Sequence, residues 1–431
     1  MHHKGLLVLA IVLVLSLLAG LACAGGQPAT TSAPETPAKE TTPIKIGFMG
    51  NLSSASSLSA KAAAQLAVDE FNAAGGIDGR KVELIVEDTK GEIPKCVELY
   101  KKLVMVDKVD LVVIGEKVEM GVAGMETGAE LYPEYPHIFI NTTGSGDVIW
   151  QKVATNYNKY KFGFQTYYYT SSGYLTVMVP KDSGPMWRDV IKVKKLALIY
   201  EDMEWTKPVR QGIPNVYPSA KEIFKSLGID VVYESTLSLD QKVFTSVLDD
   251  IARSGAEGID MVVGYIDEAA FVKQWADSSA KNLPIFMWGG LVGMPQAWEA
   301  TGGKCAGVMV GSSMVREPIT EKTVPFMDNL YNKFKVGAIF GSHTTYDSLY
   351  GYKKAVETAK TTNAEAVIKA MEKVEEVAVL GTIGWDAKNH YNLPSPKYIT
   401  PSVQWQNKEM KIVYPTTLKS AVPYKNPADC R

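Results

Sequence analysis

The sequence predicts an α/β protein built from two doubly wound, Rossmann-like lobes with a cleft between them. Three observations support this fold class. The 431 residues are more than one compact core usually needs, so two or three domains are expected. Short aliphatic runs alternate with stretches of helical periodicity, as in parallel sheets covered by helices. This alternation pauses near residue 166 and then starts again, which indicates a second sheet.

Residues 1–23 are predicted to be a secretion signal, because a short polar start precedes an aliphatic stretch from Leu6 to Ala22. The stretch ends in "GLAC", which resembles the lipobox of secreted lipoproteins and predicts lipidation of Cys23, although Gly20 replaces the usual apolar residue. An uncleaved helical anchor and ordinary cleavage are the alternatives. We expect an extracytoplasmic protein, periplasmic or on the outer face of the cytoplasmic membrane, tethered by a lipid or a helix.

Residues 24–43 are predicted to form a disordered linker. They are rich in Pro, Thr, Ala and Gly and cannot bury enough apolar surface to offset the entropy lost on ordering.

The overall composition argues against nucleic acid as a partner and against a metal site. A formal net charge of −2 provides no basic footprint for nucleic acid. Beyond Cys23, the cysteines are Cys96, Cys305 and Cys430, with no metal-binding spacing. We therefore expect no metal site and no cofactor. One disulfide remains possible, but the sequence does not select the pair.

Four strands are expected in the first half: "IKIGFMG", "KVELIVED", "DLVVIG" and "HIFIN". Between the first two, Ala63, Leu66, Ala67 and Phe71 keep the spacing of one apolar helical face. Gly75-Gly76 should end this helix, since glycine readily adopts the left-handed cap. Ser53 and Ser54 are expected to cap its start.

The second half begins with strands at "KLALIYED", "DVVYESTL", "GIDMVVGYI" and "PIFMWGG", separated by helices such as Ala220 to Leu227. Phe244, Leu248 and Ile251 share one face of another helix. A strand at "GVMVGSSM", helices near 323–335, 344–360 and 364–375, and a β-rich tail around "LGTIGWD" and "SVQWQ" complete the chain.

Small polar residues follow many of these strands. In open α/β sheets, ligands bind beyond the carboxyl ends of the strands, where loops and helix N-termini gather. The loops "GNLSSASS", "NTTGSGD", "EDMEW", "GYIDE" and "WGG" all fall at such ends, so they are predicted to form the two walls of a cleft.

The segment "IKIGFMGNLSS…AAAQLAVDEFNAAGGIDGRKVELIVEDT" resembles the opening of type I extracytoplasmic (periplasmic) solute-binding proteins of the branched-chain amino acid, or leucine-binding, ABC transporter group. A weaker likeness extends to residue 415. The resemblance implies two lobes joined by three crossings, near residues 166, 315 and 380. The first lobe would hold 44–166 and 316–380, and the second 167–315 and 381–431.

The resemblance also implies a function and a set of binding residues. The lobes would close around a small-molecule ligand and then dock on ABC permease subunits. Thr143, Gly144 and Ser145 correspond to the loop that donates hydrogen bonds to a ligand carboxylate. Trp205 and Tyr265 correspond to aromatic residues that cover an apolar group or stack on a ring.

Two departures leave the ligand unidentified. Glu119 or Met120 falls where the family has a hydroxyl, and Glu119 is a candidate to face the ligand. Gly289-Gly290 replaces the acid that pairs with an amino-acid ammonium, for which an unpaired buried charge is costly. Asp202, Asp267 or Glu268 could substitute for this acid. A branched-chain amino acid, an amide, a urea or an aromatic acid all remain open as the ligand.

Further ligand contacts are considered for Ser53 and Ser54, beside their expected capping role, and for Tyr167 to Tyr169 at the first crossing.

An enzyme is the second hypothesis, but the mature region has only His137, His343 and His390 and no HExxH, GxSxG, GxGxxG or Walker motif. A ligand-sensing receptor domain of the same fold is the third. Transport, with binding and without catalysis, is preferred.

Overall fold

The computed structural model describes residues 41–144, 146–166, 173–213, 217–294, 296–311, 315–339, 341–392 and 401–431. The predicted signal segment, Cys23 and most of the predicted linker, residues 24–40, lie outside the described residues, as do Ser145 and Tyr167 to Tyr169. Residues 41–431 form one compact unit.

The first sheet has five parallel strands in the order β2-β1-β3-β4-β5. Because consecutive strands run in the same direction, helices connect them across the faces of the sheet. The strands are β1 Ile44–Gly50, β2 Val82–Asp88, β3 Leu111–Ile114, β4 Ile138–Asn141 and β5 Gly163–Gln165. The connecting helices are α1 Ala55–Ala73, α2 Ile93–Lys101 with its continuation η1 Lys102–Asp107, α3 Val118–Leu131, α4 Val148–Thr155 and α5 Tyr157–Tyr160.

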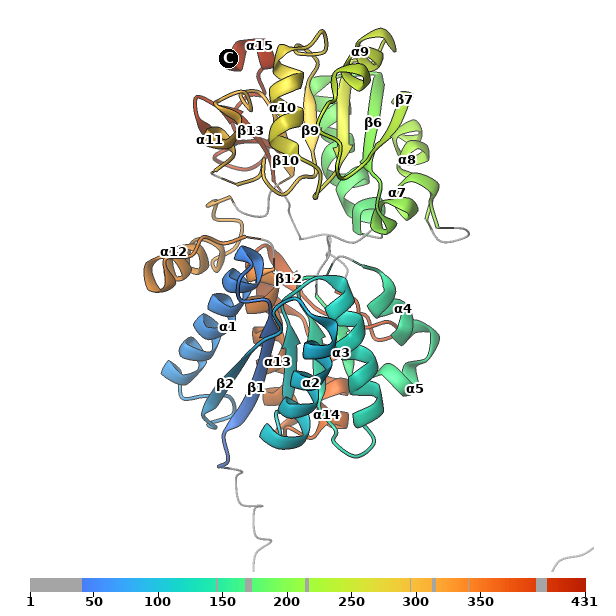
Figure 1. The fold of residues 1–431 in the computed structure, drawn as a ribbon. Coiled ribbons are helices and arrows are strands. Elements are labelled where there is room, and N and C mark those ends of the chain that lie inside the picture. Colours follow the sequence, from blue (N-terminus) through green and yellow to red (C-terminus); the bar gives the residue numbers. More distant parts are fainter. Residues whose placement is uncertain are drawn as a thin grey trace, which may run out of the picture. The chain divides into compact units, whose positions relative to one another are not determined.

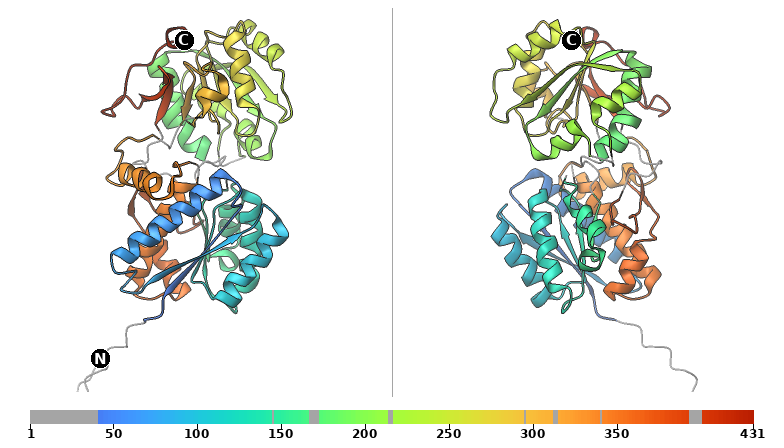
Figure 2. Two further views of the ribbon diagram at one scale, coloured as in Figure 1. Left: turned by 60° about the vertical axis from the view of Figure 1, so that its left-hand side comes forward. Right: turned by 90° about the vertical axis from the view of Figure 1, so that its right-hand side faces the viewer.

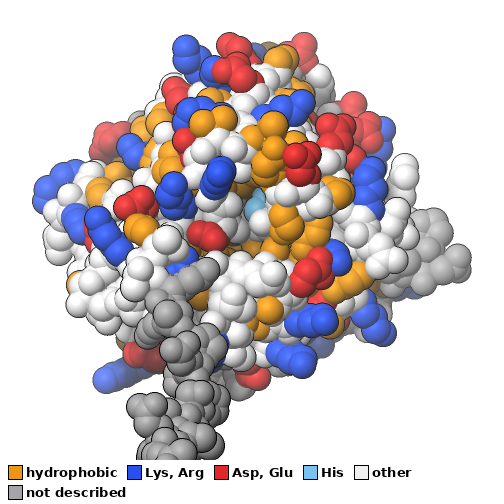
Figure 3. Space-filling view, turned by 90° about the horizontal axis from the view of Figure 1, so that it is seen from below, with side chains coloured by type: hydrophobic (Ala, Val, Ile, Leu, Met, Phe, Trp, Pro, Cys, Tyr) orange, Lys and Arg blue, Asp and Glu red, His pale blue; other side chains and the backbone are white. Residues whose placement is uncertain are grey.

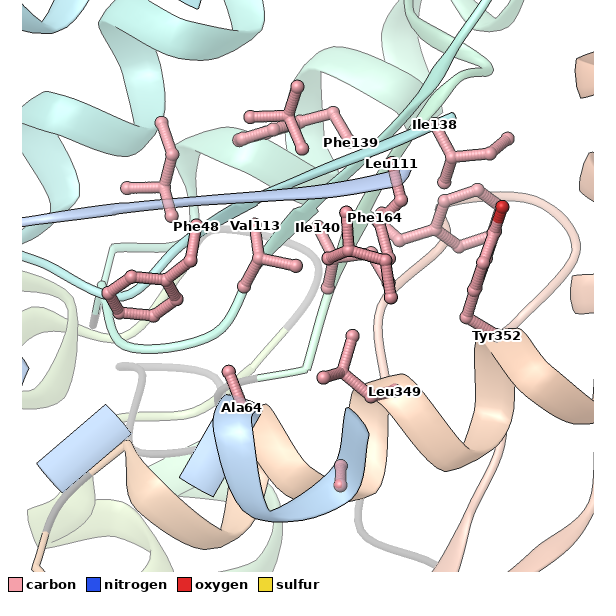
Figure 4. Packing of buried hydrophobic residues seen from close by; sticks show 14 of the residues in the cluster. Phe48, Ala64, Leu111, Val113, Ile138, Phe139, Ile140, Phe164, Leu349 and Tyr352 are labelled. Atoms are coloured by element: carbon pink, nitrogen blue, oxygen red, sulfur yellow. The ribbon is translucent and has the colours of Figure 1, made fainter. Parts of the chain in front are cut away.

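Later segments of the chain complete this first part. They are α12 Thr323–Phe334, α13 Ser342–Ala359, α14 Ala364–Met371 and the hairpin of β11 Glu376–Ala378 with β12 Gly381–Ile383. Although far apart in sequence, α1 and α13 pack side by side (Figure 1). Figure 4 shows Ala64 of α1 and Leu349 and Tyr352 of α13 among the strand side chains.

The second sheet has seven strands in the order β14-β13-β10-β9-β8-β6-β7. β13 pairs antiparallel with β10 on one side and with β14 on the other, and the remaining strand pairs of this sheet are parallel. The strands are β6 Lys195–Glu201, β7 Asp230–Leu237, β8 Gly258–Val262, β9 Ile285–Met287, β10 Met309–Gly311, β13 Ser402–Gln406 and β14 Glu409–Tyr414. Helices lie around this sheet (Figure 2). They are η2 Tyr174–Ser183, η3 Met186–Ile191, η4 Glu204–Thr206, α7 Lys207–Gln211, α8 Ala220–Ser226, α9 Thr245–Arg253, α10 Glu268–Asp277, α11 Ala297–Thr301 and α15 Pro427–Cys430.

The predicted fold class is therefore confirmed: two parallel α/β sheets each carry their own hydrophobic core. The first core also includes Ile383 and Trp385, and Tyr391 bridges to Gln165 of β5. Ile383, Trp385 and Tyr391, which were expected in the second lobe, therefore lie with the first sheet.

Local predictions for α1 agree with the structure. Ser54 is its N-cap, and Gly75 and Gly76 follow its end with φ of +95° and +88°. A side chain at Gly76 would clash, because an added Cβ would lie 1.9 Å from the carbonyl oxygen of Arg80.

Cys96, Cys305 and Cys430 are free thiols, so no disulfide joins any two of them. Across the described segments, each helix is too short or too polar to cross a bilayer. Acidic and basic side chains are interspersed with hydrophobic ones on the face drawn in Figure 3, in keeping with the small net charge.

Candidate functional site

The two sheets share one strand order, and this order places a switch point in each. β2-β1-β3-β4-β5 and β7-β6-β8-β9-β10 both start with the second strand, so the connections leave in opposite directions between β1 and β3 and between β6 and β8. Ligands of open α/β sheets bind at such points, beyond the carboxyl ends of the strands. The fold thus predicts a site at the ends of β1, β3, β6 and β8.

A pocket of about 440 Å³ lies at these strand ends. Its volume is within the range of small-molecule sites. Both sheets contribute to its walls. The lining residues are Asn51, Ser54, Ser56, Ser57, Glu116, Lys117 and Thr143 from the first sheet and its helices, and Tyr174, Met178, Trp205, Val263, Gly264, Tyr265, Trp288, Gly289, Gly290, Met294 and Gly311 from the second.

The wall from the first sheet is held together by short hydroxyl side chains. Ser54 Oγ accepts a hydrogen bond from the backbone N–H of Ser57 (3.1 Å), which satisfies one of the free amides at the start of α1. Ser57 Oγ in turn donates to the carbonyl oxygen of Gly115 (2.8 Å) at the end of β3. These two bonds join the loop after β1 to the loop after β3.

Glu116 is the acidic residue of this wall. It is the second residue after β3, and only 5% of its surface is exposed. Its Oε2 accepts a hydrogen bond from the hydroxyl of Thr89. Its Oε1 is buried and has no hydrogen-bond partner among the described residues. A buried carboxyl oxygen without a donor is costly, so this atom favours a ligand that brings one.

In the second wall, the fully buried Glu201 organises two loops. Its Oε1 accepts a hydrogen bond from Trp205 Nε1 (2.7 Å). Its Oε2 accepts from the backbone N–H groups of Gly264 (2.8 Å) and Tyr265 (2.7 Å). The acid at the end of β6 therefore fixes both Trp205 and the loop after β8.

Glu268 plays the same part for the loop after β9. It accepts hydrogen bonds from the N–H groups of Gly290 (2.7 Å) and Val292 (3.0 Å). Burial, with the charge of Glu201 nearby, raises the pKa of Glu268 to about 7, against the opposing effect of these backbone bonds. A Cβ at Gly289 would lie 2.7 Å from Glu268 Oε2, so the carboxyl group occupies the space that a side chain at residue 289 would need.

Among the three acids considered as substitutes at Gly289-Gly290, Glu268 is thus the one beside that loop. Asp267 instead caps α10 through the N–H of Ala270. Asp202 lies at the surface, 3.8 Å from Arg210.

Aromatic side chains cover much of the second wall. The buried Tyr174 donates its hydroxyl proton to Asp260 Oδ1 (3.0 Å), and Trp187 Nε1 donates to Asp260 Oδ2 (2.7 Å). Burial raises the pKa of Asp260 to about 7, although both hydrogen bonds act in the opposite direction. Trp288 meets Tyr174 edge to face, with ring centroids 5.7 Å apart. These contacts hold the rings in fixed orientations.

Three of the residues predicted to bind ligand, Thr143, Trp205 and Tyr265, line the pocket. Two others do not. Ser53 is bonded to Asn51 Oδ1 at the surface, while its neighbour Ser54 lines the pocket.

Gly144 is likewise absent from the lining. Its carbonyl oxygen accepts from Gln165 Nε2 (3.2 Å), and a Cβ on it would lie 2.8 Å from Val118 Cα.

The structure places Glu119 outside the lining of the pocket. Helix α3 begins at Val118, so Glu119 lies in its first turn and is exposed, and Met120 is buried in the core. The loop after β3 is therefore only Gly115 to Lys117, and Glu116 and Lys117 reach the pocket instead. The sequence feature that could have identified Glu116 is its position directly after "DLVVIG", where the strand-end loop begins.

Tyr174, Met178, Trp288 and Met294 were also missed as individual residues, although Trp288 lies in the "WGG" loop that was predicted to form a wall.

Two parallel α/β sheets with a pocket at the carboxyl ends of their strands have the architecture of a periplasmic binding protein. The family model described as periplasmic binding protein matches residues 43–400. The chain therefore belongs to this family, and the resemblance inferred from the sequence is confirmed. Membership implies an extracytoplasmic location.

Individual proteins that are similar to this chain are also solute-binding proteins or carry transporter descriptions. Leu/Ile/Val-binding protein homolog 8 of Brucella melitensis is 22% identical over 390 residues, which cover 86% of this chain and 90% of the relative. A solved structure from Silicibacter pomeroyi, provisionally described as a branched-chain amino acid ABC transporter, has a TM-score of 0.74 at 18% identity and covers 89% of this chain and 99% of its own. A solute-binding protein from R. palustris in complex with benzoate has a TM-score of 0.63 at 16% identity, with 90% and 99% covered.

Proposed function

We propose that this protein is the solute-binding component of an ABC importer. It captures a small polar solute in the pocket, the two lobes close around it, and the closed form delivers it to permease subunits. The observation that carries this proposal is the pocket at both switch points, lined by Asn51 and Glu116 on one side and by Trp205 and Tyr265 on the other.

A cycle without chemistry is favoured by where the histidines lie. His137 hydrogen-bonds to the hydroxyl of Tyr100, and His390 contacts Glu372, both at buried positions. Burial lowers the pKa of His137 to about 4 and of His343 to about 3, so both are neutral near pH 7. None of the three belongs to the described lining of the pocket.

The size of the pocket fits the solute classes left open by the sequence: amino acids, amides, ureas and aromatic acids. One relative is named a Leu/Ile/Val-binding protein homolog, and one solved structure contains benzoate. Both share so few identical residues with this chain that the likeness supports the fold and does not identify the solute. The N-terminal residues complete the proposal: lipidation at Cys23 or an uncleaved helix would hold the protein at the membrane near its permease.

The proposal is tested by a thermal-shift screen of residues 41–431, which form one compact unit, against these four classes. A ligand at 100 times its dissociation constant adds about 2.7 kcal/mol to stability. Small-angle scattering of any complex should show a smaller radius of gyration, and the solute should be recovered unchanged. Chemical turnover of the solute, or identical scattering profiles with and without it, would contradict the proposal.

A further inference from the structure

Backbone amides of the second wall, which could otherwise bind an anion, already donate hydrogen bonds to buried acids of the protein. At the end of β8, the N–H groups of Gly264 and Tyr265 donate to Glu201. At the end of β9, the N–H groups of Gly290 and Val292 donate to Glu268. A carboxylate ligand would have to displace a buried acid to reach any of these four donors.

Acidic side chains also lie behind this wall, and their ionised forms repel an anion. Glu201 and Glu268 lie directly beneath the loops that line the pocket, and Asp260 lies beneath Tyr174. On the opposite side, Glu116 Oε1 is a buried acceptor that lacks a donor among the described residues. Lys117 is the single basic residue in the described lining, and its side chain is exposed.

The aromatic residues offer ring surface to the pocket. Trp205 and Tyr174 direct their polar hydrogens at buried carboxyl groups, away from the solute. Hydrogen bonding to an acid also makes a ring more electron-rich. Electron-rich rings attract organic cations, most strongly where water is excluded. Trp288 and Tyr265 extend the same wall.

We propose that the captured solute is a small organic cation: an amine or alkylammonium whose charged group donates to Glu116 and whose apolar body lies against Trp205, Trp288 and Tyr174. The assignment rests on the proposed function, because it names the solute class of the same pocket. In the second wall, a leucine-like carboxylate would find the N–H groups of Gly264, Tyr265, Gly290 and Val292 already bonded to buried acids, whereas an amine finds an acceptor in Glu116 and an aromatic face.

The test compares solutes of one shape and different charge. Leucine, 3-methylbutylamine and 4-methylpentanoate share a branched chain and differ only in the charged groups. Phenylalanine, 2-phenylethylamine and 3-phenylpropionate repeat the comparison with a ring. Binding to the full chain in mild non-ionic detergent is followed by intrinsic tryptophan fluorescence and by the shift in Tm. We expect at least one amine to bind about 10-fold more tightly than its matched acid and amino acid, because both of those bring a carboxylate, and burying it without enough donors costs about 1–3 kcal/mol.

Variants separate a binding role from a structural one. Glu116→Gln should weaken amine binding about 10-fold, since the amide lacks the charge but retains an acceptor for Thr89. Lys117→Gln should strengthen it, since a like charge is removed. Opposite signs at adjacent residues would not follow from general loss of structure, and the Tm of each unliganded variant checks the fold.

An acid or amino acid that binds as tightly as its amine would overturn the cation assignment and leave the solute-binding function standing. Absence of binding by all six would overturn the assignment as well, and the four-class screen would then decide the proposed function separately.

Discussion

Replacing Gly289 by alanine is the sharpest test of how the second wall is built. An added Cβ would lie 2.7 Å from Glu268 Oε2 and 2.8 Å from its Oε1. The carboxyl end of a glutamate can usually move aside, but this one is held by the N–H groups of Gly290 and Val292. We therefore expect Gly289→Ala to lose one of these bonds or to force an overpacked loop, at about 1–3 kcal/mol.

The adjacent Gly290 supplies a matched control. Its added Cβ would meet the carbonyl oxygen of Gly264 at 3.6 Å and Glu268 Oε1 at 3.8 Å, which are ordinary contacts. Both substitutions restrict the unfolded chain equally, by about 0.4–1 kcal/mol, so this contribution cancels in the comparison. Gly289→Ala should be about 2 kcal/mol less stable than Gly290→Ala in urea unfolding followed by tryptophan fluorescence. Equal midpoints for the two variants would refute the packing of Glu268 behind Gly289.

Three further predictions concern other supports of the fold. Ser54→Ala should cost about 1 kcal/mol of unfolding free energy through the lost cap, whereas the exposed Ser53→Ala should cost less than about 0.5; equal effects in urea would contradict the assigned cap. Glu201→Ala should cost about 3–5 kcal/mol in the same assay, because it removes the buried acceptor of three part-buried donors; a near-neutral result would show that water replaces the acid. Burial raises the pKa of Asp347 to about 7, so the folded state holds this proton more tightly than the unfolded chain, and the stabilisation present below pH 4 is lost as the pH rises through 7. Asp347→Asn should remove this loss of unfolding free energy, which amounts to up to about 4 kcal/mol. The stability of the variant relative to the parent protein should therefore rise between pH 5 and pH 8. Parallel plots of unfolding free energy against pH would contradict this prediction.

Features encoded within a few residues were predictable from the sequence. Gly75 and Gly76 follow the end of α1 with positive φ, the conformation that glycine adopts most readily after a helix. Ser54 caps the start of α1 by accepting a hydrogen bond from the amide of Ser57, three residues away. The polar loops at strand ends were found for the same reason, since a parallel strand that runs into small polar residues ends at the sheet edge.

What the sequence did not reveal depends on contacts between distant segments. Glu116 and Glu119 are both acidic residues after a strand, and only the start of α3 at Val118 decides which one reaches the pocket. Glu268 lines no surface itself, and its role appears only once α10 packs behind Gly289, 21 positions along the chain. No local pattern marks such a pair.

The buried acids of the second wall explain how a pocket can be ready before its solute arrives. Glu201 accepts hydrogen bonds from the indole N–H of Trp205 and from the backbone amides of Gly264 and Tyr265, so these donors of the loops after β6 and β8 are already satisfied. A wall already ordered in this way adds little ordering cost on binding, so more of the interaction energy appears as affinity. The selection of the solute then falls on the groups that remain unsatisfied, and Glu116 on the opposite wall is the buried acid among them.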